Sequence, residues 1–172
     1  MTDRKKWARW LLYAAELLLL FFLQETPGLM PLLMGVKPFL VLAAVLTVAM
    51  AEDPVPAMFL GAFAGLLQDF GGGSPMGYHG LAFAVLCYLL SGICGTRMQI
   101  HLFTAILLGL AACLPPVLLD WLLLYMAAGY SMPAYALLRV YLPLYFYTLL
   151  MIPPCYGIQK LVQRVCGRYG MR

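Results

Sequence analysis

The chain has 172 residues, of which 64% are hydrophobic and only 10% are charged. This small share of polar residues cannot cover a water-facing exterior, which excludes an ordinary soluble domain. The composition therefore indicates a protein embedded in the lipid bilayer. The formal net charge of +4 is not a nucleic-acid footprint, because the basic residues gather mainly near the two ends of the chain. We therefore expect one all-α integral membrane domain over residues 1–172, with no nucleic acid as a partner.

The first predicted span covers residues 7–23. Four basic residues stand at its start: Arg4, Lys5, Lys6 and Arg9. No small-residue cleavage site follows the span, which favours a retained membrane helix over a signal peptide. Glu16 lies near its middle, and an ionisable group at that depth should face the bundle or a wet cavity. Two interpretations are open for Glu16. It is a packing residue that is protonated or hydrogen-bonded, or it is part of an intramembrane polar site with a binding or coupling role.

Two short apolar runs follow, at residues 38–51 and 55–68, with only Glu52, Asp53 and Pro54 between them. At about 1.5 Å per residue such a run reaches roughly 20 Å, short of a hydrocarbon core of roughly 30 Å. The two helices therefore either thin the membrane locally or form a hairpin that enters it without crossing. The chain has about six transmembrane helices in the first case and four in the second.

The run at 55–68 carries a stripe of small residues. Ala57, Gly61 and Gly65 are spaced four apart, and Asp69 is the next step on the same helix face. In a bilayer, burying leucine against leucine gives helices little reason to associate, whereas small residues let two backbones approach closely. We interpret the stripe as a helix-packing face, directed either towards a partner protein or towards another helix of the same chain.

A glycine-rich loop follows Asp69. Gly71, Gly72 and Gly73, followed by Pro75, should end the helix, and Gly77 precedes the next apolar run. A carboxylate at that helix end is within reach of exposed backbone N–H groups. We expect Asp69 to cap this loop by hydrogen bonds rather than to carry protons, so that an asparagine keeps much of the function and an alanine loses it.

The remaining predicted spans are residues 78–95, 100–127 and 140–158. The prolines at 115 and 116 should kink the fifth span, and Asp120 near its outer end is a second candidate for an intramembrane polar site. Six tyrosines between residues 125 and 147 are typical of the aromatic belt at a membrane interface.

The basic residues predict the orientation. With six spans, nine of them fall on the side of the N-terminus: Arg4, Lys5, Lys6, Arg9, Arg97, Lys160, Arg164, Arg168 and Arg172. Only Lys37 and Arg139 fall on the other side. This bias predicts that both termini are cytoplasmic, with six spans or with four.

Catalytic, metal and cofactor patterns are absent from the sequence. The five cysteines show no Cys-x-x-Cys spacing and are interpreted as small hydrophobic residues, and His79 and His101 stand alone. No glycine loop has phosphate-binding form, and no set of nucleophile and base has usable spacing. We expect no enzyme, no cofactor and no metal, and an interaction role.

A family resemblance rests on residues 38–90. Pro38 opens one helix, Gly61-x-x-x-Gly65-Leu-x-x-Asp69 follows in the next, and then come Gly73-Ser-x-x-Gly77 and Leu81-Ala-Phe-Ala. Together with the length, span pattern and basic tail, these resemble the bacterial rod shape-determining MreD family. The resemblance implies that Gly61, Gly65, Asp69 and Gly77 are signature residues. Gln68 departs from the pattern, because an apolar or aromatic residue is expected there.

The resemblance also implies a role. MreD proteins are non-catalytic inner-membrane scaffolds of the cell-elongation machinery, which bind the single-span protein MreC and are linked to MreB filaments and peptidoglycan synthases. Their fold is similar to the substrate-binding subunits of energy-coupling-factor vitamin transporters, and such a subunit is the alternative function. Those subunits carry an Ala-x-x-x-Ala face on the first helix, which this chain lacks: it has Ala8, Ala14 and Ala15 there.

Overall fold

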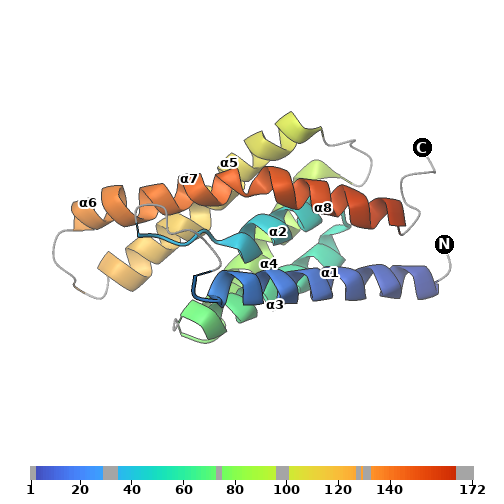
Figure 1. The fold of residues 1–172 in the computed structure, drawn as a ribbon, viewed down its shortest axis with the longest axis horizontal. Helices are drawn as coiled ribbons and strands as arrows, with labels where there is room; N and C mark the ends of the chain where they lie inside the picture. The colour runs from blue at the N-terminus through green and yellow to red at the C-terminus, as the bar shows by residue number, and fades with distance from the viewer. Residues whose placement is uncertain are drawn as a thin grey trace.

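The computed structural model describes residues 3–28, 35–72, 75–95, 101–126, 129 and 133–165. This part of the chain is helical and contains no strand (Figure 1). The α-helices are α1 (Asp3–Glu25), α2 (Leu40–Ala49), α3 (Pro54–Gly72), α4 (Tyr78–Cys94), α5 (Leu102–Leu119), α6 (Pro133–Ala136), α7 (Leu142–Leu150) and α8 (Ile152–Val165). Two π-helical segments, η1 (Asp120–Met126) and η2 (Leu137–Tyr141), extend α5 and join α6 to α7.

Helix α2 is the centre of the bundle. All ten of its residues are buried, and it packs against α1, α3, α4, α5, α7 and α8. Its one polar side chain, Thr47, donates its hydroxyl to the carbonyl of Ala44 at 2.7 Å. A helix that is apolar on all sides has no face for water, and here protein surrounds it. The sequence left open how this short run meets the membrane; in the structure its immediate surroundings are other helices of the chain.

Three helices of the described part are long and apolar enough to cross a membrane: Trp7–Glu25, Leu102–Leu123 and Ala134–Arg164. Helices α2 and α4 are shorter apolar helices. Large apolar side chains such as Phe22, Leu89 and Phe103 are more than half exposed on the outside of the bundle, which suits contact with lipid. The predicted all-α membrane architecture with about six helices is confirmed, whereas the similarity to vitamin-transporter subunits stays a prediction.

Two elements are longer than the sequence indicated. Helix α3 continues through Gly71 and Gly72, although these glycines were expected to stop it near residue 68. A side chain at Gly71 would come within 2.8 Å of the Glu25 carboxylate, so this glycine lets the end of α3 pack against the end of α1. The last apolar segment begins at Pro133 and ends at Val165, beyond the predicted 140–158 on both sides.

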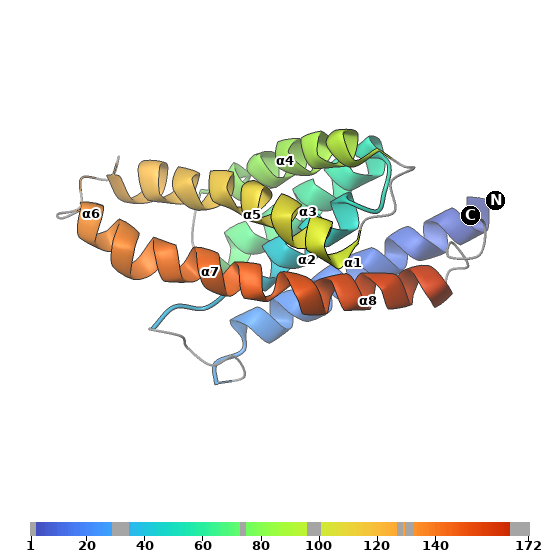
Figure 2. The ribbon, with the colours of Figure 1, turned by 90° about the horizontal axis from the view of Figure 1, so that it is seen from above.

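The two π-helical segments follow or precede prolines. Pro115 and Pro116 lie inside α5, and η1 begins at Asp120, four residues after Pro116. Pro143 offers no N–H to the carbonyl of Arg139, four residues earlier, and η2 includes Arg139. The two segments lie near each other, with the Tyr125 and Tyr141 rings 6.4 Å apart. Figure 2 shows α6, α7 and α8 as one long curved rod beside α5.

The first and last helices end at the same side of the molecule. In both ribbon views the beginning of α1 and the end of α8 lie at one end (Figures 1 and 2). Helices α1 and α3 run in the same direction, because Arg9 contacts Glu52 just before α3 and Gln24 contacts Gln68 near the end of α3. The turn between α3 and α4 therefore lies towards the opposite end from the start of α1.

Candidate functional site

The small-residue stripe of α3 lies against α4. A Cβ atom at Gly61 would lie 2.6 Å from the carbonyl oxygen of Phe83, and one at Gly65 would meet the backbone of His79 and lie 2.5 Å from the nitrogen of Gly80. Ala57 is also fully buried. Of the two alternatives for this stripe, packing within the chain is the one present in the structure, because α4 occupies the face at both glycines.

Asp69 ends the stripe and caps the start of α4. Its Oδ2 accepts hydrogen bonds from the backbone N–H groups of Gly77 at 2.8 Å and Gly80 at 3.4 Å, and its Oδ1 accepts one from His79 at 3.1 Å. Gly77 has φ +92°, a left-handed conformation that suits glycine, and this turns the chain so that the N–H groups face the carboxylate. A negative charge is also favoured at a helix N-terminus. Pro75 is exposed in this loop, and Gly73 lies outside the described residues.

His79 joins Asp69 to Asp120. Its Nδ1 lies 2.7 Å from Asp69 Oδ1 and its Nε2 lies 3.0 Å from Asp120 Oδ1, and all three residues are buried. The sequence shows no partner near His79, and the fold brings Asp120, the first residue of η1, to the imidazole from 41 residues away. The rings of Tyr78 and Phe83 lie edge-on to the imidazole, at 4.8 and 5.6 Å between centroids. This Asp69–His79–Asp120 cluster fastens α3, α4 and α5 together.

The cluster can share protons but its hydrogen bonds are already committed to structure. Two nitrogen–oxygen contacts need two hydrogens: either His79 is an imidazolium between two carboxylates, or it is neutral and Asp120 holds a proton. Asp69 accepts three backbone N–H groups, which suits the ionised form. A proton can therefore sit on either side of the His79–Asp120 contact, while the Asp69 side stays fixed.

A second buried polar cluster lies near the start of α1. Arg9 and Glu52 form an ion pair of 2.8 Å with side chains 7% and 0% exposed, and the Tyr13 hydroxyl donates to Glu52 at 3.2 Å. The Ser91 hydroxyl of α4 donates to the backbone carbonyl of Glu52 at 2.5 Å. Sequence patterns do not single out Glu52, because it stands in a three-residue connection between two apolar runs, where an exposed side chain is expected. The one available signal was an acid directly after an uninterrupted apolar helix.

Gln68, the departure from the family pattern, has a clear structural role. It is 4% exposed, and its Oε1 accepts a hydrogen bond from Gln24 Nε2 at 3.0 Å. Gln24 Oε1 in turn accepts from the backbone N–H of Val41 at 3.3 Å. Because a helix N-terminus leaves backbone N–H groups without intrahelical partners, this relay satisfies α2 and ties it to α1 and α3.

The two predicted intramembrane acids, Glu16 and Asp120, do not meet. Asp120 belongs to the histidine cluster, whereas Glu16 Oε2 accepts a hydrogen bond from Gln159 Nε2 of α8 at 2.9 Å. Helices α1 and α8 each pack on α2, and this contact joins them directly. The sequence indicates each acid as a candidate for an intramembrane polar site, and in the structure the two belong to separate buried contacts.

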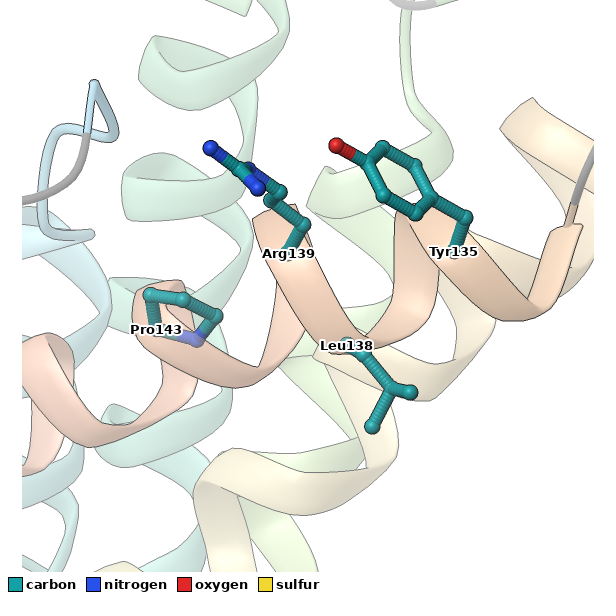
Figure 3. A pocket seen from close by; sticks show the side chains of 4 residues that line it. All are labelled: Tyr135, Leu138, Arg139 and Pro143. Carbon is teal, nitrogen blue, oxygen red and sulfur yellow. The ribbon is translucent and has the colours of Figure 1, made fainter.

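An open groove lies along the outside of α6, η2 and α7. It has a volume of about 730 Å³ and is lined by Tyr135, Leu138, Arg139 and Pro143 (Figure 3). The Arg139 guanidinium lies 5.8 Å from the centre of the Tyr135 ring, a cation–π contact. Among the described residues, no group of three or more His, Cys, Asp or Glu side chains could hold a metal ion. Cys87, Cys94, Cys113 and Cys155 are buried among the helices, and Cys166 lies outside the described residues.

The fold and its contacts define a small helical membrane protein whose buried polar side chains fasten helices to one another. The family model of the rod shape-determining protein MreD matches residues 4–165, which include every polar contact described above. The chain therefore belongs to the MreD family and is a rod shape-determining membrane protein, so the resemblance drawn from residues 38–90 is confirmed. No curated protein and no solved structure matches it.

Proposed function

We propose that this protein is a non-catalytic scaffold of the cell-elongation machinery, which binds an MreC-like single-span protein and is linked through it to MreB filaments and peptidoglycan synthases. The family membership over residues 4–165 carries this proposal. The polar side chains inside the bundle support it, because their known hydrogen bonds join helices. Both ring nitrogens of His79 contact carboxylates. Both carboxylate oxygens of Asp69 accept hydrogen bonds at the start of α4.

The proposed orientation has both termini in the cytoplasm and the α3–α4 turn outside. It rests on the basic residues near both ends of the chain and on the common position of the start of α1 and the end of α8 (Figure 2). Fluorescent and phosphatase reporters fused to either terminus should report the cytoplasm. A periplasmic signal from the C-terminal fusion would contradict this orientation.

The MreC-like partner should bind the lipid-facing surface, because α4 covers the glycine stripe. A photo-crosslinking residue placed at exposed Leu19 of α1, Leu89 of α4 or Leu107 of α5 would test three separate faces, and buried Ala64 is the matched negative control. Cross-linking to the partner from one of these faces, with none from Ala64, is the expected result. If no outward position on any helix cross-links while the two proteins co-purify, binding through the membrane faces is wrong.

The role itself is tested by complementation. In a rod-shaped bacterium depleted of its own MreD, the wild-type chain should restore cell width and co-purify with MreC. Purification with a vitamin bound, together with failure to restore shape, would favour the transporter-subunit alternative instead. A chain that inserts, folds and binds neither would contradict both functions.

A further inference from the structure

Glu16 and Gln159 form a pair that lacks one hydrogen. Gln159 Nε2 donates to Glu16 Oε2 at 2.9 Å, and Gln159 is 2% exposed. The second oxygen of each group, Oε1 of Glu16 and Oε1 of Gln159, is buried and has no hydrogen-bond partner in the described part of the chain. Both atoms are acceptors when Glu16 is ionised, so neither can satisfy the other.

The charge of an ionised Glu16 would also lack a partner. The three ion pairs of the described residues join Arg9 to Glu52 and His79 to two aspartates, and none includes Glu16. Helix α2 carries no titratable side chain, and the one acid of α3, Asp69, is held by His79. Helix α8 presents buried Cys155 one turn before Gln159, and its Lys160 ammonium lies over the Tyr156 ring at 4.7 Å.

One added proton resolves both problems. A protonated carboxyl has one O–H donor and one carbonyl acceptor, and a primary amide has an N–H donor and a carbonyl acceptor, so the two groups can form a ring with two hydrogen bonds. The first of these bonds is already present. We propose that Glu16 binds a proton on Oε1 and donates it to Gln159 Oε1, forming a proton-dependent latch between α1 and α8.

The latch is a conformational device that joins the middle of α1 to α8. With the proton bound, the pair is neutral and fully hydrogen-bonded inside the helices. When the proton leaves to solvent, a carboxylate oxygen faces an amide oxygen, and the two acceptors repel. The proton thus controls whether α1 and α8 stay joined across α2, independently of the proposed scaffold role.

Infrared spectroscopy of the full chain in lipid nanodiscs at neutral pH tests the proton directly. The difference between wild type and Glu16→Gln should contain the C=O stretch of a carboxylic acid. Glu25→Gln is the matched control on the same helix, since partly exposed Glu25 lies at the helix end, and it should remove carboxylate bands instead. A Glu16 difference spectrum with carboxylate bands alone would overturn the proposal.

Two further variants separate a proton site from a packing contact. Glu16→Gln can form an amide–amide ring and should melt like the wild type, while Glu16→Leu should melt earlier because Gln159 loses its partner. In Gln159→Leu the acid band of Glu16 should shift, since its carbonyl loses the hydrogen bond. Raising the pH until the acid band disappears should speed backbone hydrogen exchange in residues 10–20 and 153–165 of the wild type, relative to Glu16→Gln at the same pH. Equal exchange in the two proteins after the band has disappeared would refute the latch.

Discussion

Replacing Gly65 with alanine adds a single methyl group at the closest approach of two helices. The new Cβ would lie 2.5 Å from the Gly80 nitrogen and would overlap the His79 carbonyl. These are backbone atoms of α4, which cannot rotate away as a flexible side chain can. Helices α3 and α4 would have to separate, and Asp69, one turn further along α3, would move away from the N–H groups that it caps.

The size of the effect follows from the rigidity of the contact. Overpacking costs typically about 1–3 kcal/mol and occasionally more, and a clash with backbone belongs at the upper end, so we expect about 3 kcal/mol for Gly65→Ala. For a chain of this size that corresponds to a melting midpoint lower by roughly 6–12 °C. Gly61→Ala should cost less, because its nearest contacts are the Phe83 carbonyl at 2.6 Å and the Cys87 side chain at 3.0 Å.

The matched control is Gly92→Ala in the exposed surface of α4, where an added Cβ has no atom within 4 Å. Alanine is the better helix former by about 1 kcal/mol, so this variant should melt at or above the wild-type temperature. Thermal unfolding in one detergent, followed by circular dichroism and by thiol exposure of the buried cysteines, gives the comparison. If Gly65→Ala melts at the same temperature as Gly92→Ala, the helices are not in close contact at Gly65 and the packing account fails.

Three further predictions concern the buried polar contacts, each measured by melting in detergent. Asp69→Asn should cost about 1–3 kcal/mol and Asp69→Ala more, because both carboxylate oxygens accept backbone N–H bonds and an amide has only one acceptor; equal stability of wild type and Asn would refute this. Arg9→Met or Glu52→Met alone should lower the free energy of unfolding by about 3–5 kcal/mol, and the double variant should lose less than either single variant. A loss in the double variant equal to the sum of the two single losses would exclude the pairing. Gln68→Leu should lower the free energy of unfolding by about 1–3 kcal/mol, whereas Gln163→Leu, at a partly exposed position, should change it little. Equal losses in the two variants would show that the hydrogen bond from Gln24 to Gln68 is unimportant.

The geometry of the Asp69 cap limits what an asparagine can replace. The sequence alone predicts a loop cap, for which an asparagine is an adequate replacement. The structure has one oxygen facing Gly77 and Gly80 and the other facing His79. Since an asparagine side chain would turn N–H groups towards N–H groups on one of these sides, only part of the cap would remain.

Local patterns were enough to predict the class of fold. Composition indicated a membrane protein, and a four-residue spacing placed Gly61, Gly65 and Asp69 on one face of a helix. These features depend on neighbours within a turn or two, which the sequence displays directly. The identity of the covering helix was not predictable in this way, because periodicity gives the direction of a face but not what packs against it.

The polar partners could not be predicted for the same reason. Arg9 meets Glu52 across 43 residues and His79 meets Asp120 across 41, so each contact depends on how whole helices are placed. Arg9 reads as one of several basic residues before a span, and only the folded bundle buries it against an acid. Glu52 reads as part of a loop, yet its side chain is fully enclosed.

The enclosed position of α2 has a consequence for how the protein is made. Ten residues at about 1.5 Å each give a helix of about 15 Å, about half of a bilayer core, so α2 is a poor substrate for insertion as an independent span. Its neighbours α5, α7 and α8 emerge from the ribosome long after it does. During synthesis α2 can therefore pack at first only against α1, α3 and α4, and its surroundings are complete only when α8 has been made. Chains cut short before α8 should consequently be cleared by membrane proteases, even though most of their hydrophobic segments are present.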